Sequence, residues 1–103
     1  MGDTDMLEQF SRTEILLGEG AMQRLYKARV AVFGVGGVGG YTVEALARCG
    51  VGQLDLCDSD TVSVSNINRQ ILATRSVVGQ LKVDVAKARI ADINPDCVVR
   101  TYP

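Results

Sequence analysis

Three glycines carry the first chemical signal in this sequence. Gly34, Gly36 and Gly39 fall on the G-x-G-x-x-G spacing, between an apolar run at residues 30–33 and a helical pattern that starts at Tyr41. In such a unit the first glycine permits a tight turn, the second lets phosphate approach the backbone, and the third lets the helix lie close to the sheet. The free N–H groups and the positive dipole end of the helix then face an anion. The context favours phosphate binding, although Gly-rich turns also occur as plain connections.

Two carboxylates follow the next strand pattern, residues 53–57. Asp58 lies 19 residues after Gly39, where a dinucleotide-binding unit places the carboxylate that accepts hydrogen bonds from a ribose. Asp60 is a second candidate, two residues further on. An acidic pair after a strand is otherwise an ordinary turn. The upstream glycines favour ribose binding by Asp58.

Polar and cationic side chains come after these carboxylates. Asn66, Arg69 and Lys82 are groups that a nicotinamide-nucleotide site does not obviously need. Arginine offers a planar fork of donors to phosphate oxygens, and lysine a compact charge. Lys82 is expected in the first turn of a helix, where a cation opposes the dipole unless an anion compensates. Each of these side chains alone is typical of a solvated surface. Because the three follow a ribose carboxylate as a group, phosphate binding and a solvated surface are about equally favoured.

The elements that must position these residues predict an α/β fold. A helical prelude, in which Ser11 and Glu14 fit a capping box, precedes a β-α-β-α-β pattern. The expected strands and helices are residues 30–33, 41–48, 53–57, 79–93 and 97–101. This is the N-terminal half of a Rossmann-like doubly wound sheet, with strand order 3-2-1 and all site elements at one edge. We expect a helical segment at residues 1–28 and a nucleotide-binding half-domain at residues 29–103, in a chain that looks truncated.

Within that fold, the run 30–33 predicts a strand that is buried on both faces. A sheet that stops at three strands would leave this strand with an unpaired edge. Val30, Val32 and Phe33 would then need a partner to cover them. We therefore expect at least a dimer, with this strand or its neighbouring helices at the interface.

Composition excludes several other classes. The 103 residues suit one domain, and their net charge of −1 gives no electrostatic sign of a nucleic-acid-binding surface. No apolar run is long enough to cross a bilayer and no secretory leader is visible, so we expect a cytoplasmic protein without a membrane partner. Cys49, Cys57 and Cys97 match no metal or redox motif and are expected as buried thiols. Histidine is absent, which removes the usual general base.

The ordered set of motifs resembles the HesA/MoeB/ThiF family, the adenylating enzymes related to ubiquitin-activating enzymes. The matching motifs are Gly34-x-Gly36-Gly37-x-Gly39, Asp58-x-Asp60, Ser65-Asn66-x-x-Arg69-Gln70 and Val78-Gly79-Gln80-x-Lys82. The resemblance runs from about Phe10 to Tyr102. Stretches such as Phe10-Ser11-Arg12-Thr13 and Ile93-Asn94-Pro95 are most similar to the tRNA threonylcarbamoyladenosine dehydratase branch.

The resemblance implies a site for ATP with Mg²⁺. It implies nucleotide contacts for Gly34, Gly36, Gly37, Gly39, Asp58, Asp60, Asn66, Arg69 and Lys82. It also implies catalytic roles for Arg69, Lys82 and Arg12, the last matching an arginine that such enzymes insert into the partner subunit's site, so a homodimer is expected. No residue of this sequence is assigned to a metal, because the family's metal-binding aspartate follows a later strand.

The implied reaction is adenylation. A carbonyl or carboxylate oxygen attacks the α-phosphorus, pyrophosphate leaves and an adenylate remains. In the dehydratase branch this activates the threonylcarbamoyl side chain on a tRNA adenosine, which then cyclises; in the carrier branch it activates the C-terminal carboxylate of a sulfur-carrier or ubiquitin-like protein. An NAD-dependent oxidoreductase half-domain and a non-catalytic nucleotide-binding module stay open as alternatives.

Overall fold

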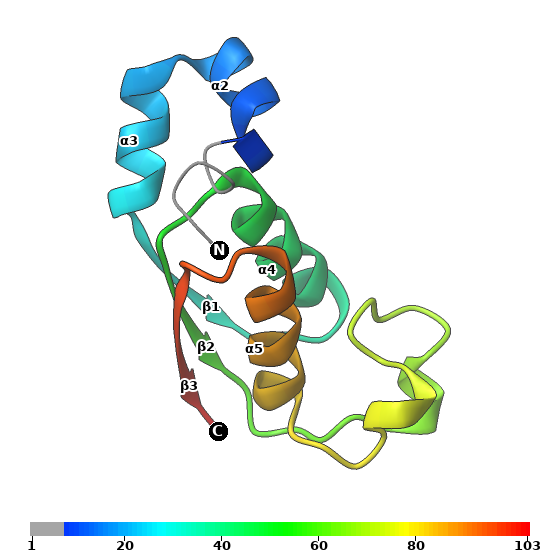
Figure 1. Ribbon diagram of the computed structural model, residues 1–103. Coiled ribbons are helices and arrows are strands. Elements are labelled where there is room, and N and C mark those ends of the chain that lie inside the picture. The colour runs from blue at the N-terminus through cyan, green and yellow to red at the C-terminus, as the bar shows by residue number, and fades with distance from the viewer. Residues whose placement is uncertain (1–7) are drawn as a thin grey trace.

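The computed structural model describes residues 8–103, and the first seven residues of the expected helical segment lie outside that range. Figure 1 shows short helices at the start, followed by alternating strands and helices. The elements are α2 (Ser11–Leu17), α3 (Glu19–Lys27), β1 (Arg29–Phe33), α4 (Gly37–Cys49), β2 (Gln53–Cys57), the short 3₁₀ turns η1 (Val64–Asn66) and η2 (Arg75–Val77), α5 (Lys82–Ile93) and β3 (Val98–Tyr102). This order confirms the predicted α/β, Rossmann-like β-α-β-α-β pattern after a helical prelude. The boundary between residues 28 and 29 as a domain border stays a prediction.

The sheet has three parallel strands in the order β1-β2-β3, which confirms the predicted 3-2-1 arrangement. The strands pair residue for residue, so Phe33 lies beside Cys57, and Cys57 beside Tyr102. All three carboxyl ends therefore meet at one edge. The chain leaving each strand is tied to its neighbour there: the Gly34 N–H donates to the Cys57 carbonyl over 2.8 Å, and the Asp58 N–H to the Tyr102 carbonyl over 3.2 Å.

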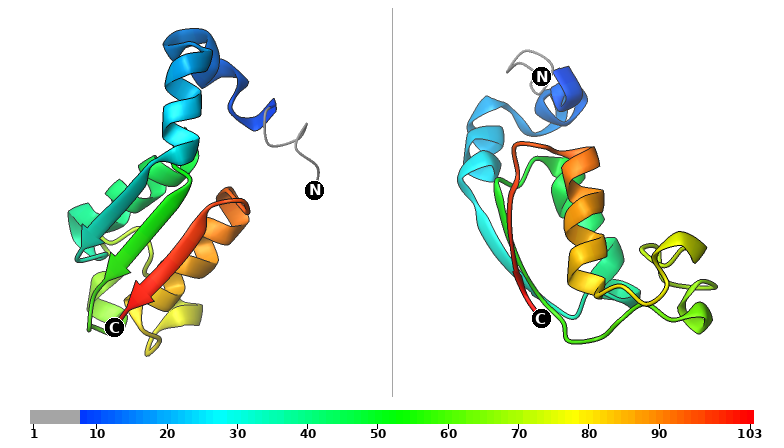
Figure 2. Two further views of the ribbon diagram at one scale, coloured as in Figure 1. Left: turned by 90° about the vertical axis from the view of Figure 1, so that its left-hand side faces the viewer. Right: turned by 60° about the horizontal axis from the view of Figure 1, so that its bottom comes forward.

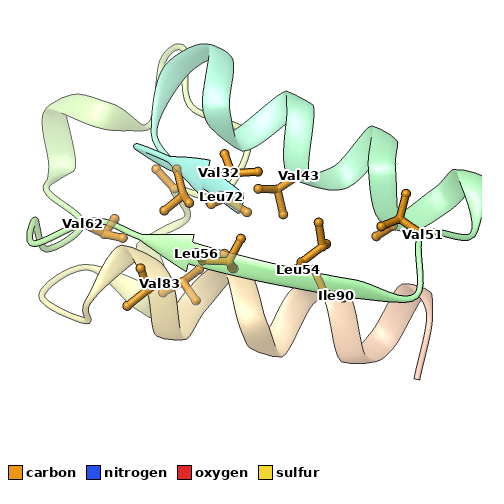
Figure 3. Close-up of a cluster of buried hydrophobic side chains, with 14 residues drawn as sticks. Val32, Val43, Val51, Leu54, Leu56, Val62, Leu72, Val83 and Ile90 are labelled. Carbon is orange, nitrogen blue, oxygen red and sulfur yellow. The ribbon is translucent and has the colours of Figure 1, made fainter. Parts of the chain in front are cut away.

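Both crossover helices, α4 and α5, cover the same face of the sheet (Figure 2). This follows because both connections are right-handed and step in the same direction across the sheet. Between these two layers lies the core, to which strands, helices and the β2–α5 connection all contribute (Figure 3). Its labelled members are Val32, Val43, Val51, Leu54, Leu56, Val62, Leu72, Val83 and Ile90.

The prediction that β1 is buried on both faces is wrong. Val32 is buried under the helices and Val30 is half-buried, but Ala31 is exposed and Phe33 is 81% exposed on the other face. A continuous apolar run does not reveal which of its faces a helix will cover. Among the three residues expected to need a partner, Phe33 alone is left open to water.

The two long helices begin where capping and turn geometry allow, and the predicted starts were off by a few residues. Helix α4 starts at Gly37 rather than Tyr41, and α5 at Lys82 rather than Gly79. Gly79 has φ of +91°, which a right-handed helix does not accept. The N–H of Lys82 bonds the Asp60 carbonyl over 2.9 Å, which fixes the start of α5 beside the chain leaving β2.

The N-terminal pair α2 and α3 stands at the amino ends of the strands (Figures 1 and 2). Phe10, 1% exposed, packs against Met22, Leu25 and Tyr26 and anchors α2 to α3. The predicted capping box at Ser11 is wrong: Ser11 is already helical, and no side chain caps the helix. Burial of Phe10 decided the helix start over the weaker capping preference.

Several apolar side chains and one cysteine are exposed on the surface, which the sequence pattern did not predict. The α2 helix has no buried residue, and Ile15 and Leu16 on it are 85% and 83% exposed. Cys49 is exposed, contrary to the expected burial, and the thiols of Cys57 and Cys97 are partly covered; all three are free. No helix among residues 8–103 is both long and apolar enough to span a bilayer.

Candidate functional site

The Gly-rich turn between β1 and α4 forms as predicted, and glycine is needed at its positions for different physical reasons. Gly34 and Gly37 have φ of +86° and +41°, the left-handed region that favours glycine. Gly39 has a different constraint, since a Cβ there would lie 1.7 Å from the Gly34 carbonyl oxygen. The predicted close approach of the helix to the strand is therefore confirmed. Gly36 has an ordinary extended backbone, so only the space around it matters.

The N-terminus of α4 lies at Gly36, which caps the helix without any side-chain hydrogen bond. No acidic residue lies in the first turn to balance the helix dipole. The first N–H groups of a helix have no partner within that helix. These features make the turn suitable for an anion supplied from outside the helix.

Asp58 fastens the Gly-rich turn to the end of β2. One carboxylate oxygen accepts the Val35 N–H over 2.9 Å, and the other accepts the Asp60 N–H over 2.8 Å. Each carboxylate oxygen has a second lone pair, so these bonds leave acceptor capacity for a ribose hydroxyl. The Asp60 side chain is exposed and points to no described partner, while its carbonyl holds the start of α5.

The connection from β2 to α5 is shaped by Asn66, which is buried. Its side-chain oxygen accepts the Ser63 N–H over 2.9 Å in a reciprocal capping box that closes η1. Its carbonyl accepts the N–H groups of Arg69 and Gln70. The structure thus gives Asn66 a loop-forming role that motif reasoning did not include. Ser63 and Asn66 therefore form a capping box that the sequence pattern did not predict.

Arg69 lies on the surface of the same connection. One terminal nitrogen of its guanidinium donates to the Ser65 carbonyl over 2.9 Å and to the Asn68 side chain over 3.0 Å. These partners are neutral, so the positive charge is not compensated by a carboxylate among the four described ion pairs. An arginine held this way keeps donors available for an anionic ligand.

Lys82 is a cation that lies against the Gly-rich turn. It is the first residue of α5 and only 8% exposed. Its ammonium nitrogen lies 3.0 Å from the position that a Cβ on Gly36 would occupy, so it lies against the N-terminus of α4. No carboxylate among residues 8–103 pairs with it. A buried cation near two helix N-termini is unfavourable until an anion binds.

Gln70 reaches the same place, and sequence reasoning did not select it as a site residue. Its side-chain oxygen lies 2.8 Å from that Cβ position on Gly36. The signal was present in the motif that runs from Ser65 to Gln70, but a glutamine beside an arginine is unremarkable until the fold places it. Gly36, Gln70 and Lys82 thus converge from three separate segments.

Arg12 does not join this group within one chain. It is exposed on α2, at the amino end of the sheet, whereas the Gly-rich turn follows the carboxyl end of β1 (Figures 1 and 2). The structure therefore brings Asp58 and Lys82 to the Gly-rich turn, places Asn66 and Arg69 on the connection that carries Gln70, and leaves Arg12 apart from them.

Two other features lie away from this edge. A cavity of about 540 Å³ lies at the amino end of the sheet, contains none of the predicted site residues, and is lined by Tyr26 and Cys97 among others. Burial raises the pKa of both of these groups. On the open face of the sheet, a hydrogen bond from Arg29 lowers the pKa of Asp55, to which Arg100 adds a weaker attraction. Among residues 8–103 no three acidic or thiol side chains gather as metal ligands.

The comparisons with known proteins agree with this geometry. A sequence profile of the ThiF family matches residues 10–103. The tRNA threonylcarbamoyladenosine dehydratase of Bacillus subtilis (strain 168) is 56% identical over 94 residues, which cover 91% of this chain and 37% of the relative. The molybdopterin-synthase adenylyltransferase of Salmonella typhimurium is 46% identical over 102 residues, which cover 96% of this chain and 40% of the relative.

A solved structure also matches closely. The Escherichia coli tRNA N6-threonylcarbamoyladenosine dehydratase, in a crystal structure in complex with ATP, superposes with a TM-score of 0.91 and 46% identity. The match covers 92% of this chain and 39% of that one. The chain therefore spans about two fifths of the length of each of these three relatives. The expected resemblance to adenylating enzymes and to the dehydratase branch is confirmed.

Proposed function

The chain belongs to the ThiF family, and from this premise we propose that it forms the phosphate-binding part of an ATP-dependent adenylating enzyme. The observation that carries the proposal is Lys82, a residue only 8% exposed, whose ammonium lies against Gly36 at the N-terminus of α4. A cation there without a described carboxylate partner favours a ligand with several negative charges. ATP with Mg²⁺ would be such a ligand, and ATP is bound in the solved relative with a TM-score of 0.91.

In the proposed reaction a substrate oxygen forms a bond to the α-phosphorus of ATP. The bond from that phosphorus to the β-phosphate oxygen breaks, pyrophosphate leaves with its electron pair, and an adenylate remains. Negative charge builds up on the phosphoryl oxygens in the transition state, so positioned cations and N–H groups supply most of the catalysis. Gly34, Gly36, Gly37 and Gly39 would shape the phosphate cradle, and Asp58 would accept the ribose hydroxyls.

Lys82 and Arg69 would act on the developing charge. Lys82 is already against the cradle, whereas Arg69 would exchange the Ser65 carbonyl for a phosphate oxygen. Such an exchange replaces a neutral acceptor with a charged one and is favourable. Asn66 would serve mainly by holding the backbone that carries Arg69. Mg²⁺ would arrive with the nucleotide, and we assign none of its ligands to this chain.

As substrate we propose the threonylcarbamoyl group on a tRNA adenosine, whose activated oxygen then leaves as the group cyclises. The support is the 56% identity to the Bacillus subtilis dehydratase. The 46% identity to a molybdopterin-synthase adenylyltransferase over 96% of the chain favours a carrier-protein C-terminus as second candidate. In a full-length reaction with α-labelled ATP, failure of both substrates to yield either a labelled adenylate or labelled AMP would exclude both.

We also propose that the full-length protein is a homodimer located in the cytoplasm. Arg12 lies far along the fold from the phosphate cradle of its own chain, and its helix α2 exposes Ile15 and Leu16. Contiguous apolar side chains on a projecting helix favour an interface with a second copy. The free cysteines are typical of a reducing compartment.

Thermal stabilisation by nucleotides tests the choice of ligand. A ligand that binds only the folded state raises Tm according to its concentration and affinity. We expect Mg²⁺-ATP to raise the Tm of the full-length protein more than NAD does at equal concentration. ATP carries a third phosphate, and Lys82 places a positive charge beside the Gly-rich turn that suits it. Equal or greater stabilisation by NAD would contradict adenylation and restore the oxidoreductase alternative.

A further inference from the structure

Gln70 occupies the space where the proposed function puts phosphate. Its side-chain oxygen lies 2.8 Å, and the carbon bearing it 3.1 Å, from the Cβ position on Gly36, beside the Lys82 ammonium at 3.0 Å. Its backbone is fixed at both ends, since its N–H bonds the Asn66 carbonyl over 2.9 Å and its carbonyl accepts the Ala73 N–H over 3.0 Å. The side chain is therefore delivered to Gly36 by a rigid turn rather than by a mobile surface segment.

A phosphate on Gly36 cannot accept this arrangement unchanged. The amide oxygen of Gln70 would face a phosphate oxygen, and two acceptors repel each other. The last torsion of a glutamine side chain is soft and roughly two-fold, so the amide can turn without moving its stem. Turned, it presents the NH₂ group of Nε2 to the phosphate.

We propose that Gln70 is a further phosphate-binding residue of this site, whose Nε2 donates a hydrogen bond to a nucleotide phosphate oxygen above Gly36. This inference rests on the proposed function. The Gln70 amide presents its oxygen to the space at Gly36 when the site is free, and turns its NH₂ group to the phosphate when nucleotide is bound. The exchange requires an amide, because a carboxylate can accept but cannot donate, and a thioether does neither effectively.

The test compares two substitutions of similar shape in the full-length protein. Gln70→Met keeps the length and removes the donor, and Gln70→Glu keeps the shape and adds a negative charge. We expect calorimetry to show ATP affinity reduced about tenfold for Gln70→Met, the effect of one donor to a charged acceptor. We expect a larger loss for Gln70→Glu, because its charge repels phosphate. Gln23→Glu, the same substitution at an exposed position of α3, is the matched control and should bind ATP normally.

Adenosine separates phosphate binding from a structural role. It lacks phosphate, so both Gln70 variants should bind adenosine within about twofold of the wild type if the donor acts on phosphate. Normal ATP affinity in Gln70→Met would overturn the inference, as would an equal loss of ATP and adenosine affinity. A folded wild-type protein that binds no ATP would contradict the proposed function itself. ATP binding by the wild type that the Gln70 variants leave unchanged would contradict only the role of Gln70.

Discussion

Gly36 and Gly39 show how two glycines of one motif serve different purposes. A methyl group on Gly39 would lie 1.7 Å from a backbone oxygen, which cannot move without breaking the turn. A methyl group on Gly36 would instead meet the ends of two flexible side chains, Gln70 and Lys82. Gly39 is therefore required for folding, whereas Gly36 keeps space for the ligand. The motif therefore combines a structural constraint and a binding constraint that its spacing alone does not separate.

The two substitutions to alanine should consequently have opposite signatures. We expect Gly39→Ala to lose more than about 3 kcal/mol of unfolding free energy, because backbone must shift in a tight turn. Gly36→Ala should change the unfolding free energy by less than about 1 kcal/mol and weaken ATP binding, since Lys82 and Gln70 are pushed aside. Urea denaturation and calorimetry measure the two quantities. A Gly36→Ala variant with normal ATP affinity would show that phosphate does not lie on this residue.

At the scale of elements, the ion pairs on the open sheet face give a pH dependence. Arg29 bonds Asp55 over 2.6 Å across β1 and β2, and this bond lowers the pKa of Asp55. A carboxylate with a lowered folded-state pKa contributes stability above its unfolded pKa, and loses it as the pH falls through the folded pKa. The stabilising effect therefore belongs to neutral and mildly acidic pH.

We expect Asp55→Asn to flatten the acid limb of the stability curve. Between pH 5 and about pH 3, wild-type Tm should fall more steeply than that of the variant, because the variant has no carboxylate to protonate. Asp92→Asn, an exposed position on α5, is the matched control and should retain the wild-type slope. Parallel curves for wild type and Asp55→Asn would show that the Arg29 pair is not formed in solution.

The sequence predicted the elements well where a local pattern sets them. The spacing of the glycines, together with the apolar run before them and the distance to Asp58, predicted a strand, a turn, a helix and a second strand that ends in a carboxylate. All of these elements are present in the structure. The sequence pattern failed where distant residues decide. Phe10 set the start of α2 by packing on Met22, and only the direction of two crossovers determined that Phe33 would face water. Gln70 became a candidate only when the fold placed it on Gly36.

At the scale of the whole molecule, Arg12 and Lys82 lie near opposite ends of the sheet within one chain. In the proposed dimer, Arg12 of one subunit would reach Lys82 of the other. Full-length Arg12→Ala and Lys82→Met proteins should each be inactive or weak. When they are mixed and allowed to exchange subunits, half of the dimers contain one intact site, so about a quarter of wild-type activity should return. Light scattering should show a dimer throughout. Absence of any recovery in exchanged dimers would place Arg12 outside the partner's site.

ATP–pyrophosphate exchange in the full-length protein with Lys82 altered tests most directly whether this turn binds the phosphates. Lys82→Met keeps the buried stem and removes the charge, and Lys87→Met makes the same change at an exposed position of the same helix. A charge-assisted contact is worth about 1.5–3 kcal/mol, which is roughly ten- to hundredfold in rate. We expect Lys82→Met to lose exchange by that factor and Lys87→Met to retain it. Equal exchange in the two variants would contradict the assignment of phosphate to the turn at Gly36.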